Sequence, residues 1–207
     1  MNNSFVKVIV LIFLFQVLLY TSKGNDSLRY NFAFTYLHDL SDSYGKSKLL
    51  SGEFSVIKSW YGIRASYDHM QSILNANFPV EDEESKTIIS IPFTEISKMQ
   101  SGSLSFLIRP FQYKWFSFDL LLGIFYGENK CMKFSSFYYH YNPIEAKFDI
   151  LFRDYQLKKT IYKGFQTGFD FTFYFSKRIG LLAKAKIIST TNHDGFFFVG
   201  SGITIDF

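Results

Sequence analysis

Cysteine and histidine are scarce in this chain of 207 residues, and their scarcity excludes several kinds of site. Cys131 is the single cysteine, so no internal disulfide bond can form. The four histidines are scattered, and together with one cysteine they lack the spacing that metal ligands require. We therefore expect neither a metal site nor a cofactor.

Long apolar runs are also missing once the first 24 residues have passed. The longest later run, Leu120 to Tyr126, is far shorter than the ~20 residues of a membrane-spanning helix. Charge of one sign is not in large excess either. Removing Lys7 and Lys23 with the leader lowers the 22 basic residues to 20, against 18 acidic residues. This near balance argues against nucleic acid as a partner.

Aromatic residues, in contrast, are abundant. The chain has 26 Phe and 14 Tyr, and aromatic residues make up 20% of it. A secreted soluble domain of this size does not need so many. A barrel with lipid outside and an aromatic girdle at each interface does.

The first 24 residues read as a secretory signal peptide. Lys7 precedes an apolar run from Val8 to Phe15, which continues past Gln16 from Val17 to Tyr20. Ser22 and Gly24 supply small residues before a cleavage point ahead of Asn25. We expect a signal peptide over 1–24 and one β-barrel domain over 25–207. An uncleaved anchor is the alternative, but the apolar run is short for one.

The final stretch, 196–207, reads FFFVGSGITIDF and alternates with a period of two. One face is apolar, and the other carries small or polar residues, so the stretch predicts a strand with one side in lipid. Seven further stretches alternate in the same way, at about 27–37, 47–57, 60–70, 101–111, 116–126, 163–175 and 179–189. Because unpaired backbone amides in hydrocarbon cost several kcal/mol each, the eight strands must close on themselves.

Short and long connections alternate between these strands. Three short turns, near Lys58, Lys114 and Lys177, join strands on one side. On the other side we expect loops over about 38–46, 71–100, 127–162 and 190–195. The third has enough alternating aromatics to extend its two strands as a hairpin, broken at Asn142-Pro143, and the second carries an acidic run from Glu81 to Glu84.

The whole chain after the leader resembles the small eight-stranded outer-membrane barrels of OmpA/OmpX-like type, the porin-family domain without an added periplasmic domain. The resemblance implies an all-β, antiparallel, up-and-down transmembrane barrel in the outer membrane of a Gram-negative cell. It also implies that the barrel-assembly machinery reads the terminal pattern of Gly200, Ile203, Ile205 and Phe207. The expected surroundings are outer-membrane lipids and lipopolysaccharide.

Charged residues on the predicted inner face form the first candidate site. An eight-stranded barrel is only wide enough for side chains to fill, and buried charges must be paired. We expect a lumen plugged by Arg29, Glu53, Arg64, Arg109, Asp119, Asp170, Lys184, Lys186 and Asp206. The alternative is a narrow pore or proton path.

The histidines form a second candidate site on the outer side. His38, His69 and His193 each adjoin an aspartate (Asp39, Asp68 and Asp194), and His140 lies among tyrosines. A His with a Ser and an acid is ordinary nucleophile chemistry, and Ser41, Ser43, Ser136 and Glu145 are available. No spacing demands catalysis, so we assign no catalytic residue, and an outer-leaflet lipid A-modifying enzyme remains the alternative.

Aromatic residues of the third loop form the last candidate. Exposed aromatic clusters are typical of binding surfaces. The candidate surface consists of Phe134, Phe137, Tyr138, Tyr139 and Tyr141. The alternative is that they continue the interfacial girdle. We expect a monomeric, non-enzymatic barrel with a structural or surface-interaction role towards an unidentified extracellular ligand.

Overall fold

The computed structural model describes residues 28–41, 46–81, 88–142, 147–191 and 194–207. The predicted signal peptide, 1–24, lies outside this part of the chain. Eight strands account for nearly all of it: β1 (Leu28–Asp39), β2 (Lys46–Lys58), β3 (Tyr61–Glu81), β4 (Ile88–Gln112), β5 (Phe116–Asn142), β6 (Lys147–Tyr174), β7 (Ile179–Thr190) and β8 (Gly195–Asp206). No helix of the described ranges is long and apolar enough to cross a membrane.

The strands form one closed sheet in which every strand is antiparallel to its neighbours in the chain. β8 closes the ring by pairing with β1, in a register that sets Asp206 opposite Asn31 and Phe198 opposite Asp39. The predicted all-β, eight-stranded up-and-down barrel is therefore confirmed.

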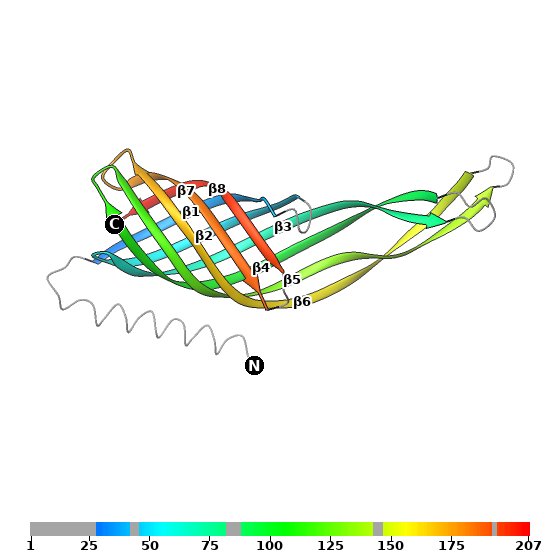
Figure 1. Cartoon of the computed structure of the whole chain (residues 1–207), viewed down its shortest axis with the longest axis horizontal. Coiled ribbons are helices and arrows are strands. Elements are labelled where there is room, and N and C mark those ends of the chain that lie inside the picture. The colour runs from blue at the N-terminus through cyan, green and yellow to red at the C-terminus, as the bar shows by residue number, and fades with distance from the viewer. Residues whose placement is uncertain (1–27, 42–45, 82–87, 143–146, 192–193) are drawn as a thin grey trace.

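Short turns join the strands at one end of the barrel (Figure 1). They are residues 59–60, 113–115 and 175–178, and they lie where the sequence predicted them. Ser59 takes a positive φ of 56° in the tightest of them. Phe207 lies at the same end, where its N–H donates a hydrogen bond of 2.8 Å to the carbonyl oxygen of Tyr30.

Two hairpins continue far beyond the opposite end of the barrel (Figure 1). β3 and β4 stay paired out to Glu81 and Ile88, so most of the expected loop over 71–100 is strand instead. β5 and β6 stay paired out to Asn142 and Lys147, as the aromatic alternation predicted. Of the acidic run, only Glu81 lies among the described residues. We call the described parts of these strands that lie beyond the β4–β5 pairing, residues 75–81, 88–94, 133–142 and 147–156, the outer hairpins.

The outward face of the barrel carries a continuous apolar band. Phe34, Leu122 and Phe165 are each about two-thirds exposed. A water-soluble monomer rarely exposes a contiguous apolar patch beyond a few hundred Å². On β5 the band runs from Phe116 to Tyr126, and ten residue steps at ~3.3 Å and a tilt of ~40° span about 25 Å. This height matches the apolar band of an outer-membrane barrel.

Aromatic residues mark both edges of the band. Those at the short turns are Trp60, Tyr61, Tyr113 and Trp115, all exposed. Those at the hairpin end are Tyr36, Tyr67 and Tyr126, also exposed. Such girdles lie at membrane–water interfaces because their rings are apolar and their polar atoms remain in contact with water.

Candidate functional site

The period of two along each strand directs charged side chains into the lumen. Inward positions of β2, β3, β4, β5, β6 and β7 carry eight buried charges: Glu53, Arg64, Asp68, Arg109, Asp119, Asp170, Lys184 and Lys186. Four are cations and four are anions. Such a balance within the network is favourable, because each unpaired charge would cost several kcal/mol. A further buried carboxylate, Asp39 of β1, accepts hydrogen bonds from Ser41 instead.

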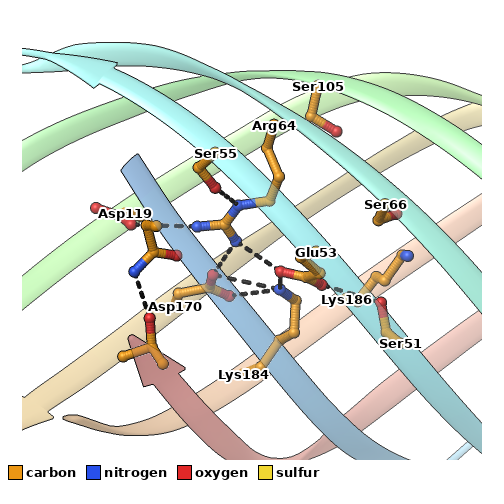
Figure 2. Close-up of polar contacts among 12 residues, drawn as sticks. Ser51, Glu53, Ser55, Arg64, Ser66, Ser105, Asp119, Asp170, Lys184 and Lys186 are labelled. Atoms are coloured by element: carbon orange, nitrogen blue, oxygen red, sulfur yellow. Dashed lines mark hydrogen bonds and ion pairs between the residues drawn. The ribbon is translucent and has the colours of Figure 1, made fainter. Parts of the chain in front are cut away.

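Arg64 lies at the centre of this network (Figure 2). Its Nε donates to Oγ of Ser55 at 2.8 Å, and its Nη1 donates to Oε2 of Glu53 at 3.1 Å. Nη1 also donates to Asp170, and Nη2 reaches Oδ2 of Asp119 at 3.4 Å. The guanidinium of β3 thus contacts carboxylates on β2, β5 and β6 and ties one wall of the barrel to the next.

Two lysines of β7 complete the network. Lys184 Nζ donates to Oε2 of Glu53 at 2.7 Å and lies 3.2 Å from Oδ1 of Asp170. Lys186 Nζ donates to Oδ2 of Asp68 at 2.5 Å. Since β7 and β3 are four strands apart in a ring of eight, the pair of Lys186 and Asp68 joins opposite walls of the lumen.

Asp68 was missed by the sequence analysis, which grouped it with His69 at the outer side. Its carboxylate is buried, and the residue is 1% exposed. The sequence does indicate that Asp68 faces the lumen, because it follows Gly62, Arg64 and Ser66 at the same spacing of two. The error lay in ending the inward pattern of this strand at Ser66.

Arg109 and Asp119 form a second, bidentate pair near the short turns. Arg109 Nε lies 2.6 Å from Asp119 Oδ1, and Nη2 lies 2.9 Å from Oδ2. This fork geometry is the strongest form of a guanidinium–carboxylate contact. Because Asp119 also contacts Arg64, the two guanidinium groups share one carboxylate.

Two expected members of the network lie elsewhere. Arg29 is exposed, because it lies at the inward parity of β1 but close to the short-turn end of that strand. Asp206 is only half-buried, and its Oδ1 accepts a hydrogen bond from Nδ2 of Asn31. The register of the closing seam sets Asp206 opposite Asn31, which accounts for this contact.

A layer of apolar side chains covers the network on the hairpin side. Its members are Leu37, Leu49, Met70, Met99, Phe125, Tyr162, Ile188, Phe196 and Phe198, and all are nearly inaccessible. On β2, for example, Leu49 lies four residues farther from the short turn than Glu53 does. The cavity beside Arg64 and Lys184 measures about 10 Å³, which is room for about one water molecule.

Residues of the predicted insertion signal lie at the seam between β8 and β1. Ile203 and Phe207 are exposed on the outer face, and Ile205 is half-buried on the same face. Gly200 faces inward, where an added Cβ would lie 2.1 Å from the carbonyl oxygen of Tyr36. Only glycine lets the two strands approach so closely at this point.

An aromatic cluster joins the two outer hairpins. Phe134 of β5 stacks on Phe93 of β4, with ring centroids 4.8 Å apart, and Phe78 of β3 lies 6.0 Å from Phe137. The Phe134 N–H also donates to Oε1 of Glu95 at 3.1 Å. Phe134 and Phe137 were expected on an open binding surface, but the structure places both against the neighbouring hairpin.

The other members of that expected surface differ among themselves. Tyr138 is 55% exposed. Tyr139 and Tyr141 lie in the paired part of β5, but their side chains are outside the described part of the structure. The aromatic alternation therefore serves partly to hold the hairpins together.

A cavity of about 490 Å³ opens between the outer hairpins. Asn75, Asn77 and Thr94 line it from β3 and β4, and Arg153 and Tyr155 line it from β6. Arg153 Nε donates to the carbonyl oxygen of Pro92 at 3.0 Å, which fixes the guanidinium across the opening. Amide, hydroxyl, guanidinium and aromatic groups thus converge on one hollow.

The histidines do not assemble a nucleophile site within the described residues. His38 is exposed and packs edge-on against Tyr36, at 4.8 Å between centroids. Asp39 faces the other side of β1 and accepts hydrogen bonds from Ser41. Neither His38 nor His69 hydrogen-bonds to a serine or a carboxylate of the described chain. The side chain of His140, and His193 as a whole, lie outside it.

Cys131 lies beyond the apolar band on β5, opposite Ser97 and Lys158. Burial and the nearby Glu95 raise the pKa of its thiol above the ordinary value. The thiol is therefore protonated at neutral pH and a poor nucleophile. No group of metal-binding side chains occurs in the part of the chain that the structure describes.

No protein-family profile and no curated protein sequence matches the chain. Among solved structures, the chain is similar to Ail, the attachment invasion locus protein of Yersinia pestis, with 13% identity and a TM-score of 0.50, over 89% of this chain and 100% of that one. The N-terminal β-barrel domain of Pseudomonas aeruginosa OprF gives 10% identity and a TM-score of 0.50, over 86% and 97%. A major outer membrane protein of Thermus thermophilus gives 9% and 0.54, over 87% and 100%. The predicted resemblance is thus confirmed at the level of the fold, and the architecture is that of a multi-pass outer-membrane β-barrel of OmpA/OmpX-like type.

Proposed function

We propose that this protein is a monomeric outer-membrane barrel that does not conduct and that acts through its outer hairpins. After export and insertion by the barrel-assembly machinery, the barrel serves as an anchor. The hairpins then stand above the lipid as a surface that binds an extracellular ligand. The observation that carries this proposal is the cavity of about 490 Å³ between two hairpins that are locked together by stacked rings.

The filled lumen supports the absence of conduction. Ion pairs from β2, β3, β5, β6 and β7 cross it, and an apolar layer covers them on the hairpin side. An ion entering this space would have to displace buried pairs, and leaving one partner unpaired costs about 3–5 kcal/mol. These contacts support a lumen that is a polar plug and not a pore.

The chemistry of the hairpin cavity supports a glycan as the ligand. Asn75 and Asn77 provide amide donors and acceptors, Arg153 provides a cation, and Tyr155 and Phe93 provide rings. Such a mixture can hydrogen-bond to sugar hydroxyls and stack on sugar faces. The cavity is also of the size usual for small-ligand sites, which is ~300–1,000 Å³.

A truncated variant tests the role of the hairpins. Asn75 is opposite Thr94 and Phe134 is opposite Tyr155, so residues 76–93 and 135–154 can each be replaced by an Asn-Gly turn. The full protein and the truncated variant are each reconstituted in nanodiscs and applied to a glycan array. We expect the full protein to bind particular glycans and the truncated barrel to bind none. The proposal is wrong if both proteins give the same pattern, or if the full protein binds nothing.

A point variant locates the binding within the cavity. Arg153→Ala removes the guanidinium that spans the opening, and Arg178→Ala removes an exposed arginine at the short-turn end. We expect the first change to abolish binding to the selected glycans and the second to leave it intact. Equal effects of the two changes would mean that the cavity is not the site.

Planar-bilayer recording tests the plug. We expect no steady conductance from the wild-type protein or from Lys58→Ala, a change at a short turn. Steady conductance that changes in Arg64→Ala would instead establish the narrow pore.

A further inference from the structure

Four lysines and one glutamine form a row across the outward face of five neighbouring strands, just above the apolar band. The register sets Lys48 of β2 opposite Gln71 of β3, and Gln71 opposite Lys98 of β4. Lys98 is opposite Lys130 of β5, and Lys130 is opposite Lys159 of β6. All five side chains are exposed. We call Lys98, Lys130 and Lys159, which are direct neighbours, the lysine row.

The lysine row is unfavourable by itself. Side chains directly opposite each other in an antiparallel sheet have Cβ atoms ~4.5–5.5 Å apart, and like charges in such pairs are destabilising. Lys130 lies 3.3 Å from Oε1 of the exposed Glu128, a contact that water and salt weaken. Lys98 and Lys159 form no ion pair with any described residue. An arrangement of three repelling ammonium groups on a rigid sheet is stabilised by an anion that lies over all of them.

The height of the lysine row indicates where that anion comes from. On β5, Tyr126 is the last aromatic of the apolar band, and Lys130 lies four residues farther out, or ~10 Å along the membrane normal. On β6 the unbroken band ends at Phe165, because Lys163 follows on the same face with its Nζ 5.9 Å from the ring centre of Tyr126. The exposed Ile161 then lies between Lys163 and Lys159. The lysines therefore stand at the level of the lipid headgroups, and none of the three lines the hairpin cavity.

We propose that the lysine row binds the phosphate groups of a lipid headgroup in the outer leaflet. This inference rests on the membrane location in the proposed function, but not on the hairpins as a binding surface. The ammonium group of lysine is a compact charge with three donors and binds phosphate well. Three of them on adjacent strands form a flat site that suits a headgroup with two phosphates, because each phosphate can lie between two lysines.

The experiment uses the mature protein, folded in zwitterionic detergent so that no anionic lipid competes. Binding of bisphosphorylated lipid A is measured by native mass spectrometry for the wild type and for the triple change Lys98→Gln, Lys130→Gln and Lys159→Gln. A matched control changes three lysines at the short turns, Lys58, Lys114 and Lys177, to Gln. Each basic residue near an anionic surface contributes about fivefold in affinity, so we expect about a hundredfold loss in the triple variant and none in the control.

Two further probes identify which part of the lipid the lysine row binds. Lipid A without its phosphates should bind the wild-type protein as weakly as the triple variant binds intact lipid A. Inorganic phosphate at the same concentration should not compete. The inference is wrong if the triple variant keeps wild-type affinity, if the dephosphorylated lipid binds equally well, or if free phosphate displaces the lipid.

The truncated barrel separates this inference from the proposed function. Its cuts at 76–93 and 135–154 spare all three lysines, so it should bind lipid A as the full protein does. Loss of glycan binding with retained lipid binding supports both proposals. Retained glycan binding in the triple lysine variant, together with lost lipid binding, shows that the two surfaces act separately.

Discussion

Lys186 on β7 donates a hydrogen bond of 2.5 Å to Asp68 on β3, and the two side chains are only 5% and 1% exposed. The pair crosses the full width of the lumen, because the two strands belong to opposite walls. The pair therefore links β3 and β7 directly, whereas the backbone hydrogen bonds of the sheet connect these two strands only through three intervening strands.

Replacing one member of this pair leaves the other charge buried without its partner. We expect Asp68→Asn to lower the free energy of unfolding by about 3–5 kcal/mol. Urea unfolding followed by the fluorescence of Trp60 and Trp115 measures the change. Asp154→Asn, at an exposed carboxylate of β6, is the control and should change stability by less than about 0.5 kcal/mol. Equal losses would contradict the role of the pair.

The apolar band predicts a difference between two leucines of nearly equal exposure. Leu122 is 65% exposed in the middle of the band on β5, and Leu157 is 67% exposed on β6 beyond it. We expect Leu122→Lys to cost about 2–4 kcal/mol in lipid vesicles, because the new charge lies near the bilayer midplane. Leu157→Lys should cost almost nothing. Similar costs for the two changes would place the membrane elsewhere on the barrel.

The stacked rings between the outer hairpins predict a loss of rigidity when one is removed. Phe134 contacts Phe78, Phe93, Phe137 and Tyr155, so Phe134→Ala removes the centre of the cluster. We expect the outer hairpins of this variant to be cleaved at least tenfold faster by trypsin, while the barrel stays intact. Leu157→Ala, at a largely exposed position of β6, is the control and should leave the cleavage rate unchanged.

The closing seam gives Phe207 two separable roles. Its ring packs edge-on against Phe32, with the ring centroids 6.1 Å apart. As the last residue of the terminal pattern, Phe207 is also predicted to be recognised by the assembly machinery. We expect Phe207→Ala to slow insertion by the purified machinery several-fold, yet to fold normally in pure detergent. Phe175→Ala, at an exposed aromatic of the short-turn end, should affect neither. Equal slowing in both media would mean that Phe207 acts by packing alone.

Much of the architecture could be predicted from the sequence, because each barrel strand has a lipid face and a lumen face. The period of two assigned Glu53, Arg64, Asp170 and Lys184 to the lumen, and all four are buried there. The period does not give height along the strand, however. Arg29 has the inward parity but lies near the end of β1, where it is exposed to water.

The outer hairpins were harder to predict for a different reason. The expected loop over 71–100 contains Pro79 and the acidic run that begins at Glu81, and such residues are uncommon inside a paired strand. In the structure Pro79 lies opposite Ser90 within a continuous ladder. The pairing is supported by contacts such as Phe93 on Phe134, between residues far apart in the chain. Local patterns cannot reveal such contacts, and an isolated hairpin would be marginal in water.

The raised pKa of Cys131 predicts a slow thiol whose reactivity rises with pH. Burial and Glu95 both favour the neutral thiol, so less thiolate is present at pH 7 than for an ordinary cysteine. We expect iodoacetamide to modify Cys131 several-fold more slowly than a cysteine introduced by Ser135→Cys in a Cys131→Ser background, because Ser135 is exposed. The pH at which the modification rate reaches half its maximum should also be higher for Cys131. Equal modification rates and equal pH midpoints for the two cysteines would show that the Cys131 thiol is exposed to solvent and not buried.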